Sequence, residues 1–323
     1  MYVLGIDGGG TKTIAMVADE NGTVYMRAIT RGSNLNTMTP KEFEIVMSGL
    51  LLQLNVQNTE IFNQISICFA GMAGVGESGR DAEVADLLRK YLPKDIHIII
   101  KNDAFNALYA GTLGETGIVQ IAGTGSITFG VNDETKMVRS GGWGYLFDDE
   151  GSGFHLGNEA LRAVFKEFDQ RGPSTSLTAA FLQYFEVNLV PDIIGKVYGL
   201  EHPRSIIAPL SQLVVDAAIA DDEIAKRIIA NACSEMMCSI QSCHDQLFEK
   251  NHATNIVLSG GVFTNAHFFI DHFHQLAKEK LPNIRFKRAL VSPVGGAVIA
   301  ALISQQVPIN ERIVKHLNEE ISS

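Results

Sequence analysis

The first feature that could do chemistry is an acid followed by a glycine-rich run, "DGGGTKT", at residues 7–13. An apolar stretch precedes it at 2–6, and an apolar, β-branched stretch follows at 14–18. This pattern predicts a strand, a turn and a second strand. Three consecutive glycines let backbone N–H groups converge on an anion, and phosphate is the obvious ligand. The alternative is a plain hairpin turn, which needs only one or two glycines.

Two more glycine turns follow strand-like stretches. The run "AGTGS" at 122–126 lies between the apolar stretches 117–121 and 127–131, and "LSGGVFTN" covers 258–265. The strand, turn and strand of the N-terminus therefore occur twice, which predicts two related domains. The two turns would face each other across a cleft. The first turn is not a P-loop, because G-x-x-x-x-G-K-[ST] is absent there.

An acid also stands at the end of a predicted strand. Asp103 follows the apolar stretch 96–100 within "KNDAFNAL". Ligands of open α/β sheets collect at the carboxyl ends of strands, so Asp103 is a candidate base. Phosphoryl transfer needs such a base, together with a metal that bridges the phosphates. The alternative is that Asp103 serves only as the N-cap of a helix that begins near Ala104.

The remaining elements must position these groups. Thr39, Pro40 and Glu42 form a capping box that starts a helix. The other predicted elements are strands at 23–29 and 65–69, a helix at 81–91, a mostly helical middle from 158 to about 243 and a helix at 293–303. At 323 residues, two domains are expected. We place them at 1–112 and 113–305, the second with a helical insertion, and expect the tail 306–323 to pack back on the first.

Composition excludes several classes of partner. Lys and Arg number 26 against 36 Asp and Glu, a net charge of −10, which argues against nucleic-acid binding. An anionic ligand must then be held by local backbone donors and a metal. No secretory signal or membrane-spanning stretch is recognised, so no membrane partner is expected.

The cysteines indicate structural thiols. Cys233, Cys238 and Cys243 are five apart, a spacing that turns about 140° per step on a helix and does not converge on one metal. With Cys68, they are expected to be buried thiols of a protein in the reducing cytoplasm.

Taken together, the motifs resemble one superfamily over nearly the whole chain. "GIDGGGTKT", "NDA", "GTGS" and "GGWGYLFDDEGSGFHLG" (141–157) are similar to those of actin, sugar kinases and heat-shock ATPases. The last motif resembles the N-acetylglucosamine kinase branch, which is grouped with the BadF/BadG/BcrA/BcrD ATPases. This resemblance implies an α/β, two-domain, actin-like (ribonuclease H-like) fold with an interdomain cleft. It also implies an ATP- and Mg²⁺-dependent kinase for the 6-hydroxyl of an amino sugar, N-acetylglucosamine first, that forms a homodimer.

The resemblance also assigns roles to individual residues. Asp103 would take the proton from the sugar hydroxyl, and Asp7 would hold the Mg²⁺ through water. The nucleotide ligands would be Gly8, Gly9, Gly10, Thr11 and Lys12 in the first turn, Gly123, Thr124 and Gly125 in the second, and Gly260 and Gly261 near the adenosine. The sugar contacts would be Asn34, Asp103, Gly142, Trp143, Gly144 and Asp149.

One position departs from the family pattern. Asp148 stands where the family usually has a glycine, immediately before Asp149. If that position requires a positive φ, aspartate tolerates it at modest cost. An added carboxylate beside the sugar would favour a cationic amine, so glucosamine and N-acetylmuramic acid remain alternative substrates. Trp143 has a second interpretation as ordinary core packing.

Two other functions of related proteins fit this sequence less well. ATPases that activate dehydratases hold an iron–sulfur cluster between subunits, and the cysteine spacing here does not suit one. Sugar-sensing regulators carry an N-terminal DNA-binding module, whereas the first phosphate-binding strand is expected to start here at Tyr2.

Overall fold

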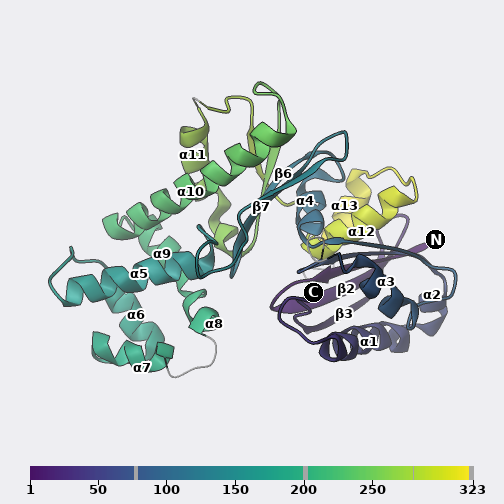
Figure 1. The fold of residues 1–323 in the computed structure, drawn as a ribbon, viewed down its shortest axis with the longest axis horizontal. Coiled ribbons are helices and arrows are strands. Elements are labelled where there is room, and N and C mark those ends of the chain that lie inside the picture. The colour runs from purple at the N-terminus through teal and green to yellow at the C-terminus, as the bar shows by residue number, and fades with distance from the viewer. Residues whose placement is uncertain (76–78, 199–202, 279, 320–323) are drawn as a thin grey trace. The chain divides into compact units, whose positions relative to one another are not determined.

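The computed structural model describes residues 1–75, 79–198, 203–278 and 280–319. The chain divides into two compact units, shown in Figure 1. The first unit comprises Met1–Glu115 and Ala289–Ser323, and the second comprises Thr116–Arg288.

The first unit is a five-stranded sheet with helices on both faces. Its strands are β1 (Tyr2–Gly8), β2 (Lys12–Asp19), β3 (Val24–Arg31), β4 (Ile65–Met72) and β5 (His97–Asn102). Its helices are α1 (Pro40–Gln57), α2 (Thr59–Asn63), α3 (Asp81–Arg89), α4 (Ala104–Thr112), α12 (Pro293–Ser304) and α13 (Glu311–Glu319). The strand order is β3-β2-β1-β4-β5. The first three strands are antiparallel, and β4 and β5 run parallel to β1.

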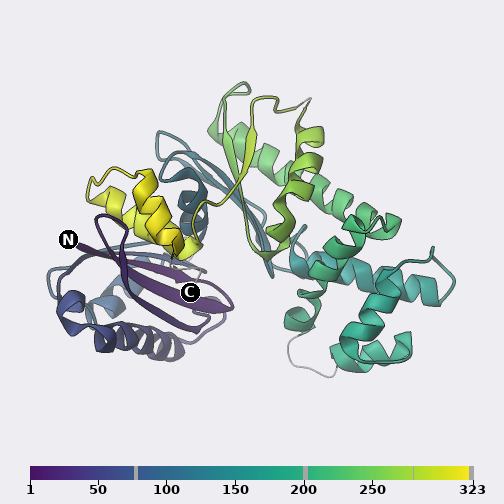
Figure 2. The same cartoon turned by 180° about the vertical axis from the view of Figure 1, so that it is seen from behind.

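Helices α1 and α12 cover opposite faces of this sheet, as both views show (Figures 1 and 2). Leu4 and Ile6 of β1 belong to the core that α1 closes. Gly5 points the other way, where a Cβ would lie 2.6 Å from the backbone nitrogen of Val298 in α12. Glycine at this position therefore lets α12 pack directly on the strand that leads into the first turn. The capping box of α1 is confirmed, since Thr39 and Glu42 bond each other's backbone N–H groups.

The second unit repeats the same sheet. Its strands are β6 (Gly117–Ala122), β7 (Ser126–Val131), β8 (Met137–Ser140), β9 (Asn255–Ser259) and β10 (Arg285–Arg288). Its helices are α5 (Gly153–Phe168), α6 (Leu177–Phe185), η1 (Val190–Asp192), α7 (Ile193–Tyr198), α8 (Pro203–Ile207), α9 (Leu210–Ile219), α10 (Glu223–Leu247), η2 (Gly261–Asn265) and α11 (Ala266–Ala277). The order β10-β9-β6-β7-β8 has the strand directions of the first unit. The predicted duplication is therefore present in the topology.

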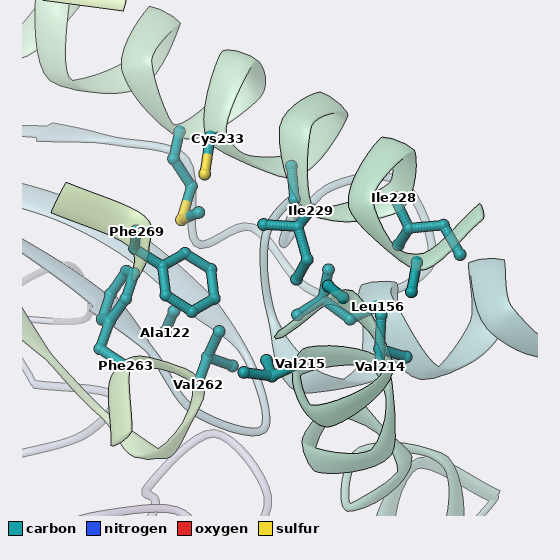
Figure 3. Close-up of a cluster of buried hydrophobic side chains, with 14 of the residues drawn as sticks. Ala122, Leu156, Val214, Val215, Ile228, Ile229, Cys233, Val262, Phe263 and Phe269 are labelled. Atoms are coloured by element: carbon teal, nitrogen blue, oxygen red, sulfur yellow. The ribbon is translucent and has the colours of Figure 1, made fainter. Parts of the chain in front are cut away.

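Helices pack over the second sheet around one hydrophobic core (Figure 3). The core joins Leu156 of α5, Val214 of α9, Ile229 of α10 and Phe269 of α11. Within the described ranges, no helix is both long and apolar enough to cross a bilayer.

The expectation that all four cysteines are buried was wrong for one of them. Cys233 and Cys243 are buried on α10, whereas Cys238, midway between them, is exposed. The spacing explains the difference, because five helical residues turn a side chain by about 140° away from the core.

The division of the chain also differs from the expected one. The first boundary falls after Glu115 rather than after 112, and residues 289–305 group with the first unit instead of the second. Helix α12 is apolar around its circumference, and it packs against β1 and α4 of the first unit. Helix α13 follows it, with Ile313 against the turn at Gly22.

Candidate active site

The first glycine turn is the tip of the β1–β2 hairpin. Gly9 N–H donates to the carbonyl of Lys12 at 3.0 Å and closes the turn. Gly10, Thr11 and Lys12 are exposed at the tip. None of the hydrogen bonds formed among the described residues uses the N–H groups of Gly10 or Thr11. These donors are therefore available to an anion.

The loop after β3 is hydrogen-bonded to this turn. Ser33 N–H donates to the carbonyl of Gly9 at 3.0 Å, and Thr13 Oγ1 donates to Ser33 Oγ at 2.7 Å in a buried position. Asn34 comes next, and its Oδ1 accepts the N–H of Asn36 at 2.9 Å. The contact with Ser33 thus holds Asn34 beside the first turn.

Asp7 stands at the end of β1 and is held by Asn106 of α4. The buried Asn106 Nδ2 donates to Asp7 Oδ1 at 2.8 Å and to the carbonyls of Ile6 and Gly71 at 3.1 and 3.3 Å. Burial raises the pKa of Asp7 to about 6, against the lowering effects of Asn106 and Lys12. This amide therefore fixes the carboxylate directly beneath the glycine turn.

Asp103 lies between β5 and α4 and shares the environment of Asp7. Its side chain makes no capping hydrogen bond to α4, and Asn102 Oδ1 accepts the N–H of Ala104 instead. Asp103 therefore occupies the N-cap position predicted for it, but its side chain does not cap the helix. Burial, followed by the nearby charge of Asp7, raises the pKa of Asp103 to about 7. A carboxylate with such a pKa is suited to accept a proton near neutral pH.

The second glycine turn has the corresponding place between β6 and β7. Gly123 N–H donates to the carbonyl of Gly125 at 2.9 Å, and Thr124 is exposed at the tip. Gly260 lies against this turn with a φ of +105°, and a Cβ there would be 2.3 Å from the carbonyl oxygen of Ala122. Gly261 begins η2 directly afterwards. The second unit therefore brings two glycine-rich segments together at one sheet edge.

The "GGWG" loop presents the one tryptophan of the chain. Gly142 and Gly144, on either side of Trp143, have φ of +79° and +111°. Trp143 is 64% exposed, so its interpretation as core packing was wrong. The Arg139 guanidinium lies 3.6 Å from the centroid of the indole ring, a cation–π contact.

The residue that replaces the usual glycine carries no left-handed strain. Asp148 lies outside the positive-φ region, whereas Asp149 adopts a φ of +66°. Asp148 Oδ2 accepts the N–H of Trp143 at 2.7 Å and closes the loop on itself. This carboxylate is therefore engaged within its own loop.

Asp149 is the buried acid of this unit, only 4% exposed. Its carboxylate accepts a hydrogen bond from Arg204 Nη2 at 3.0 Å, and the backbone N–H groups of Ser126 and Gly144 favour its ionised form. Burial raises the pKa of Asp149, and the charge of Arg204 lowers it. The acid thereby ties the second glycine turn to the "GGWG" loop.

The predicted residues thus form two groups, one in each unit. The first unit holds Asp7, Gly8, Gly9, Gly10, Thr11, Lys12, Asn34 and Asp103. The second holds Gly123, Thr124, Gly125, Gly142, Trp143, Gly144, Asp149, Gly260 and Gly261.

Sequence reasoning missed two residues that hold the acids in place. Asn106 has a signal in the sequence, because it is a polar residue inside the apolar run of α4, three residues after Asp103. Arg204 has none, because its partner Asp149 is 55 positions away.

The duplicated sheet, the paired glycine turns and the strand-end acids define an actin-like ATPase. Residues 4–304 match the BadF/BadG/BcrA/BcrD ATPase family, and the chain belongs to this family. Membership of this ATPase family implies the use of ATP. The predicted family and fold class are both confirmed.

Relatives of known name match along nearly their whole length. The chain is 32% identical over 302 residues to the N-acetylmuramic acid/N-acetylglucosamine kinase of Clostridium acetobutylicum, covering 93% of this chain and 98% of that protein. It is 32% identical over 314 residues to the N-acetyl-D-glucosamine kinase of Dictyostelium discoideum, with shares of 94% and 98%. The solved structure of a candidate N-acetylglucosamine kinase from Porphyromonas gingivalis has the same fold. Its TM-score is 0.74 at 22% identity, over 94% of this chain and 99% of that one.

Proposed function

We propose that this protein is an ATP-dependent kinase that phosphorylates the 6-hydroxyl of N-acetylglucosamine. Two relatives that are 32% identical carry names that include this sugar and this activity. The observation that carries the proposal is the pair of acids beside the first glycine turn. Burial raises the pKa of both carboxylates, and the charge of Asp7 raises that of Asp103 further, so the pair suits the cation and the proton that phosphoryl transfer requires.

Each unit offers a glycine turn that suits a nucleotide phosphate. In the first turn the N–H groups of Gly10 and Thr11, with Lys12, bind phosphate, because Gly9 N–H is already bonded within the turn. In the second turn Gly123 N–H is likewise engaged, which leaves Thr124 and Gly125 as the phosphate ligands, while Gly260 and Gly261 line the adenosine. Asp7 fits a hydrated Mg²⁺, because Asn106 occupies only Oδ1 and burial without a cation raises the pKa of this carboxylate. Held by Asp7 through water, Mg²⁺ would neutralise the charge of the phosphates.

Asp103 accepts the proton of the sugar hydroxyl as the phosphoryl group arrives. Its pKa of about 7 leaves a large fraction ionised at neutral pH while keeping it a competent base. The "GGWG" loop and Asp149 of the second unit supply an aromatic face and polar groups of the kind that a sugar requires, and Asn34 of the first unit offers an amide.

Asp148 bears on the choice among amino sugars. Its carboxylate accepts the Trp143 N–H and lies near Arg139, whose charge it faces. Since this negative charge is already balanced within the loop, it gives a cationic amine little advantage over a neutral acetamide. This favours N-acetylglucosamine over glucosamine.

The test is coupled ADP release with Mg-ATP across N-acetylglucosamine, glucosamine, N-acetylmuramic acid and glucose. We expect the highest kcat/KM with N-acetylglucosamine, and a product phosphorylated at the 6-position by NMR. If glucosamine or N-acetylmuramic acid gives the highest value, the substrate assignment is wrong. If no sugar raises ADP release above the ATP-only rate, the kinase proposal itself fails.

A further inference from the structure

Arg204 lies at the centre of the second unit's site, although no sequence motif marks it. It belongs to the short helix α8, and its Nη2 donates to Asp149 Oδ2 at 3.0 Å. The same atom lies 2.5 Å from the position that a Cβ on Gly125 would occupy, and Asp149 Oδ2 lies 2.8 Å from it. The ion pair therefore occupies the space that a side chain at position 125 would enter, directly against the second glycine turn.

The carboxylate of this pair connects three segments. It accepts a hydrogen bond from the guanidinium of Arg204, and its ionised form is favoured by the backbone N–H groups of Ser126 at the end of the turn and Gly144 in the "GGWG" loop. Asp149 does this from a left-handed backbone conformation, which a non-glycine residue keeps only when its surroundings enforce it. The position of one carboxylate thus sets both the phosphate turn and the loop proposed to bind sugar.

Arg204 is committed to this contact. Its Nε is buried and has no hydrogen-bond partner among the described residues. Its guanidinium also lies 5.2 Å from the ring of Tyr145, within the same loop. A buried carboxylate that lost this cation would tend to bind a proton, and a protonated acid is a poorer acceptor for the two backbone N–H groups.

We infer that Arg204 is a positioning residue. It keeps Asp149 ionised and oriented, and through Asp149 it holds the Gly123–Gly125 turn and the "GGWG" loop in a single arrangement. Its effect on catalysis rests on the proposed sugar kinase function, but its effect on the loop does not.

Trp143 provides a readout that needs no activity, because it is the one tryptophan and adjoins Gly144. Other charges also face this region: Asp148 and Glu150 in the loop, Arg139 on β8 and Glu235 on α10. Titration of Glu150 can therefore also change the emission of Trp143. The experiment must separate this titration from that of Asp149.

The experiment follows Trp143 emission against pH in the intact protein without ligands. Arg204→Gln should raise the midpoint of the acid transition by about one pH unit or more, because an adjacent arginine lowers a carboxyl pKa by about 1–3. Arg204→Lys keeps the charge and should shift it less. Arg171→Gln, which removes an exposed arginine paired with Asp169, is the matched control and should shift nothing. In the Asp149→Asn background, Arg204→Gln should no longer move the midpoint.

Kinetics provide the second readout. At neutral pH, Arg204→Gln should raise KM for both ATP and the sugar, and both should recover at higher pH as Asp149 ionises without its partner. An unchanged midpoint, or a shift that persists in the Asp149→Asn background, would overturn the inference. So would a pH-independent rise in the KM for ATP alone, because Arg204 would then be a phosphate ligand.

If Arg204→Gln does not fold, as judged by circular dichroism, the midpoint of Arg204→Lys is compared with that of wild type, and an upward shift is expected. The proposed function would be refuted if the wild-type protein is inactive on sugars. This inference would still stand if Arg204→Gln raises the fluorescence midpoint as expected.

Discussion

Asn106 Nδ2 lies 2.8 Å from Asp7 Oδ1, although the two residues are 99 positions apart in the chain. The same amide reaches the carbonyls of Ile6 and Gly71, at the ends of the adjacent parallel strands β1 and β4. One side chain of α4 thereby sets the position of the acid at the first glycine turn. Since α4 begins next to Asp103, both acids take their positions from the same short helix.

Removing this amide should therefore affect stability and catalysis together. We expect Asn106→Ala to lower the free energy of unfolding by about 1–3 kcal/mol, because buried acceptors lose their donor. It should also lower kcat, because Asp7 loses its fixed orientation. Urea denaturation and ADP release measure the two effects. Asn283→Ala, which removes an exposed amide with a single hydrogen bond, is the control and should change neither. Wild-type kcat in a folded Asn106→Ala protein would contradict the role given to this contact.

Asp103→Asn should abolish most of the turnover while the protein stays folded. The amide keeps the size of the side chain but cannot accept the proton, a contribution of roughly 10²–10⁴ in rate. We therefore expect kcat to fall by about two orders of magnitude or more, with nucleotide binding retained by calorimetry. A folded variant with near wild-type kcat would show that the base lies elsewhere, with Asp149 as the first alternative.

The raised pKa of Asp103 also predicts how stability changes with pH. The folded-state pKa of about 7 exceeds the ordinary value of 3.8, so the folded protein binds more protons than the unfolded chain between these values. Stability should therefore fall as pH rises from about 4 to 7. Asp103→Asn removes this loss, so its melting temperature should exceed that of wild type at pH 8, with the difference shrinking towards pH 4. Calorimetry without nucleotide or Mg²⁺ measures this, and a variant less stable than wild type at pH 8 would contradict the burial argument.

Thr11 and Thr124 provide a test of the two glycine turns. Both are exposed at the tips of corresponding hairpins, one in each unit. If their hydroxyls donate to phosphate, alanine at either position should raise the KM for ATP by about tenfold, the effect of losing one hydrogen bond to a charged group. Serine keeps the hydroxyl and should restore most of the affinity. Unchanged nucleotide kinetics in both alanine variants would mean that the turns serve only as hairpin connections.

Local sequence signals predicted most of the elements. The features that were not predicted depend mainly on contacts between residues far apart in the chain. The capping box at Thr39 and Glu42 involves neighbours in the chain, so its residue types are sufficient evidence. The edge strands β8 and β10 were missed because each has only four residues, with charged side chains among them. The partnership of Arg204 with Asp149 depends on how the helices of the second unit return to its sheet, and no local pattern records that. The catalytic and binding roles of the site residues remain predictions.

The grouping of α12 with the first unit has a consequence for biosynthesis. The ribosome delivers β1 early, but the helix that packs against Gly5 emerges only after the whole second unit. One face of the first sheet must therefore stay exposed until α12 has emerged. The second unit is continuous in the chain, so it can complete its own sheet and core before then. We expect the first glycine turn to be completed last of these parts, so that a nascent chain cannot present Asp7 and Asp103 in working order until α12 has emerged.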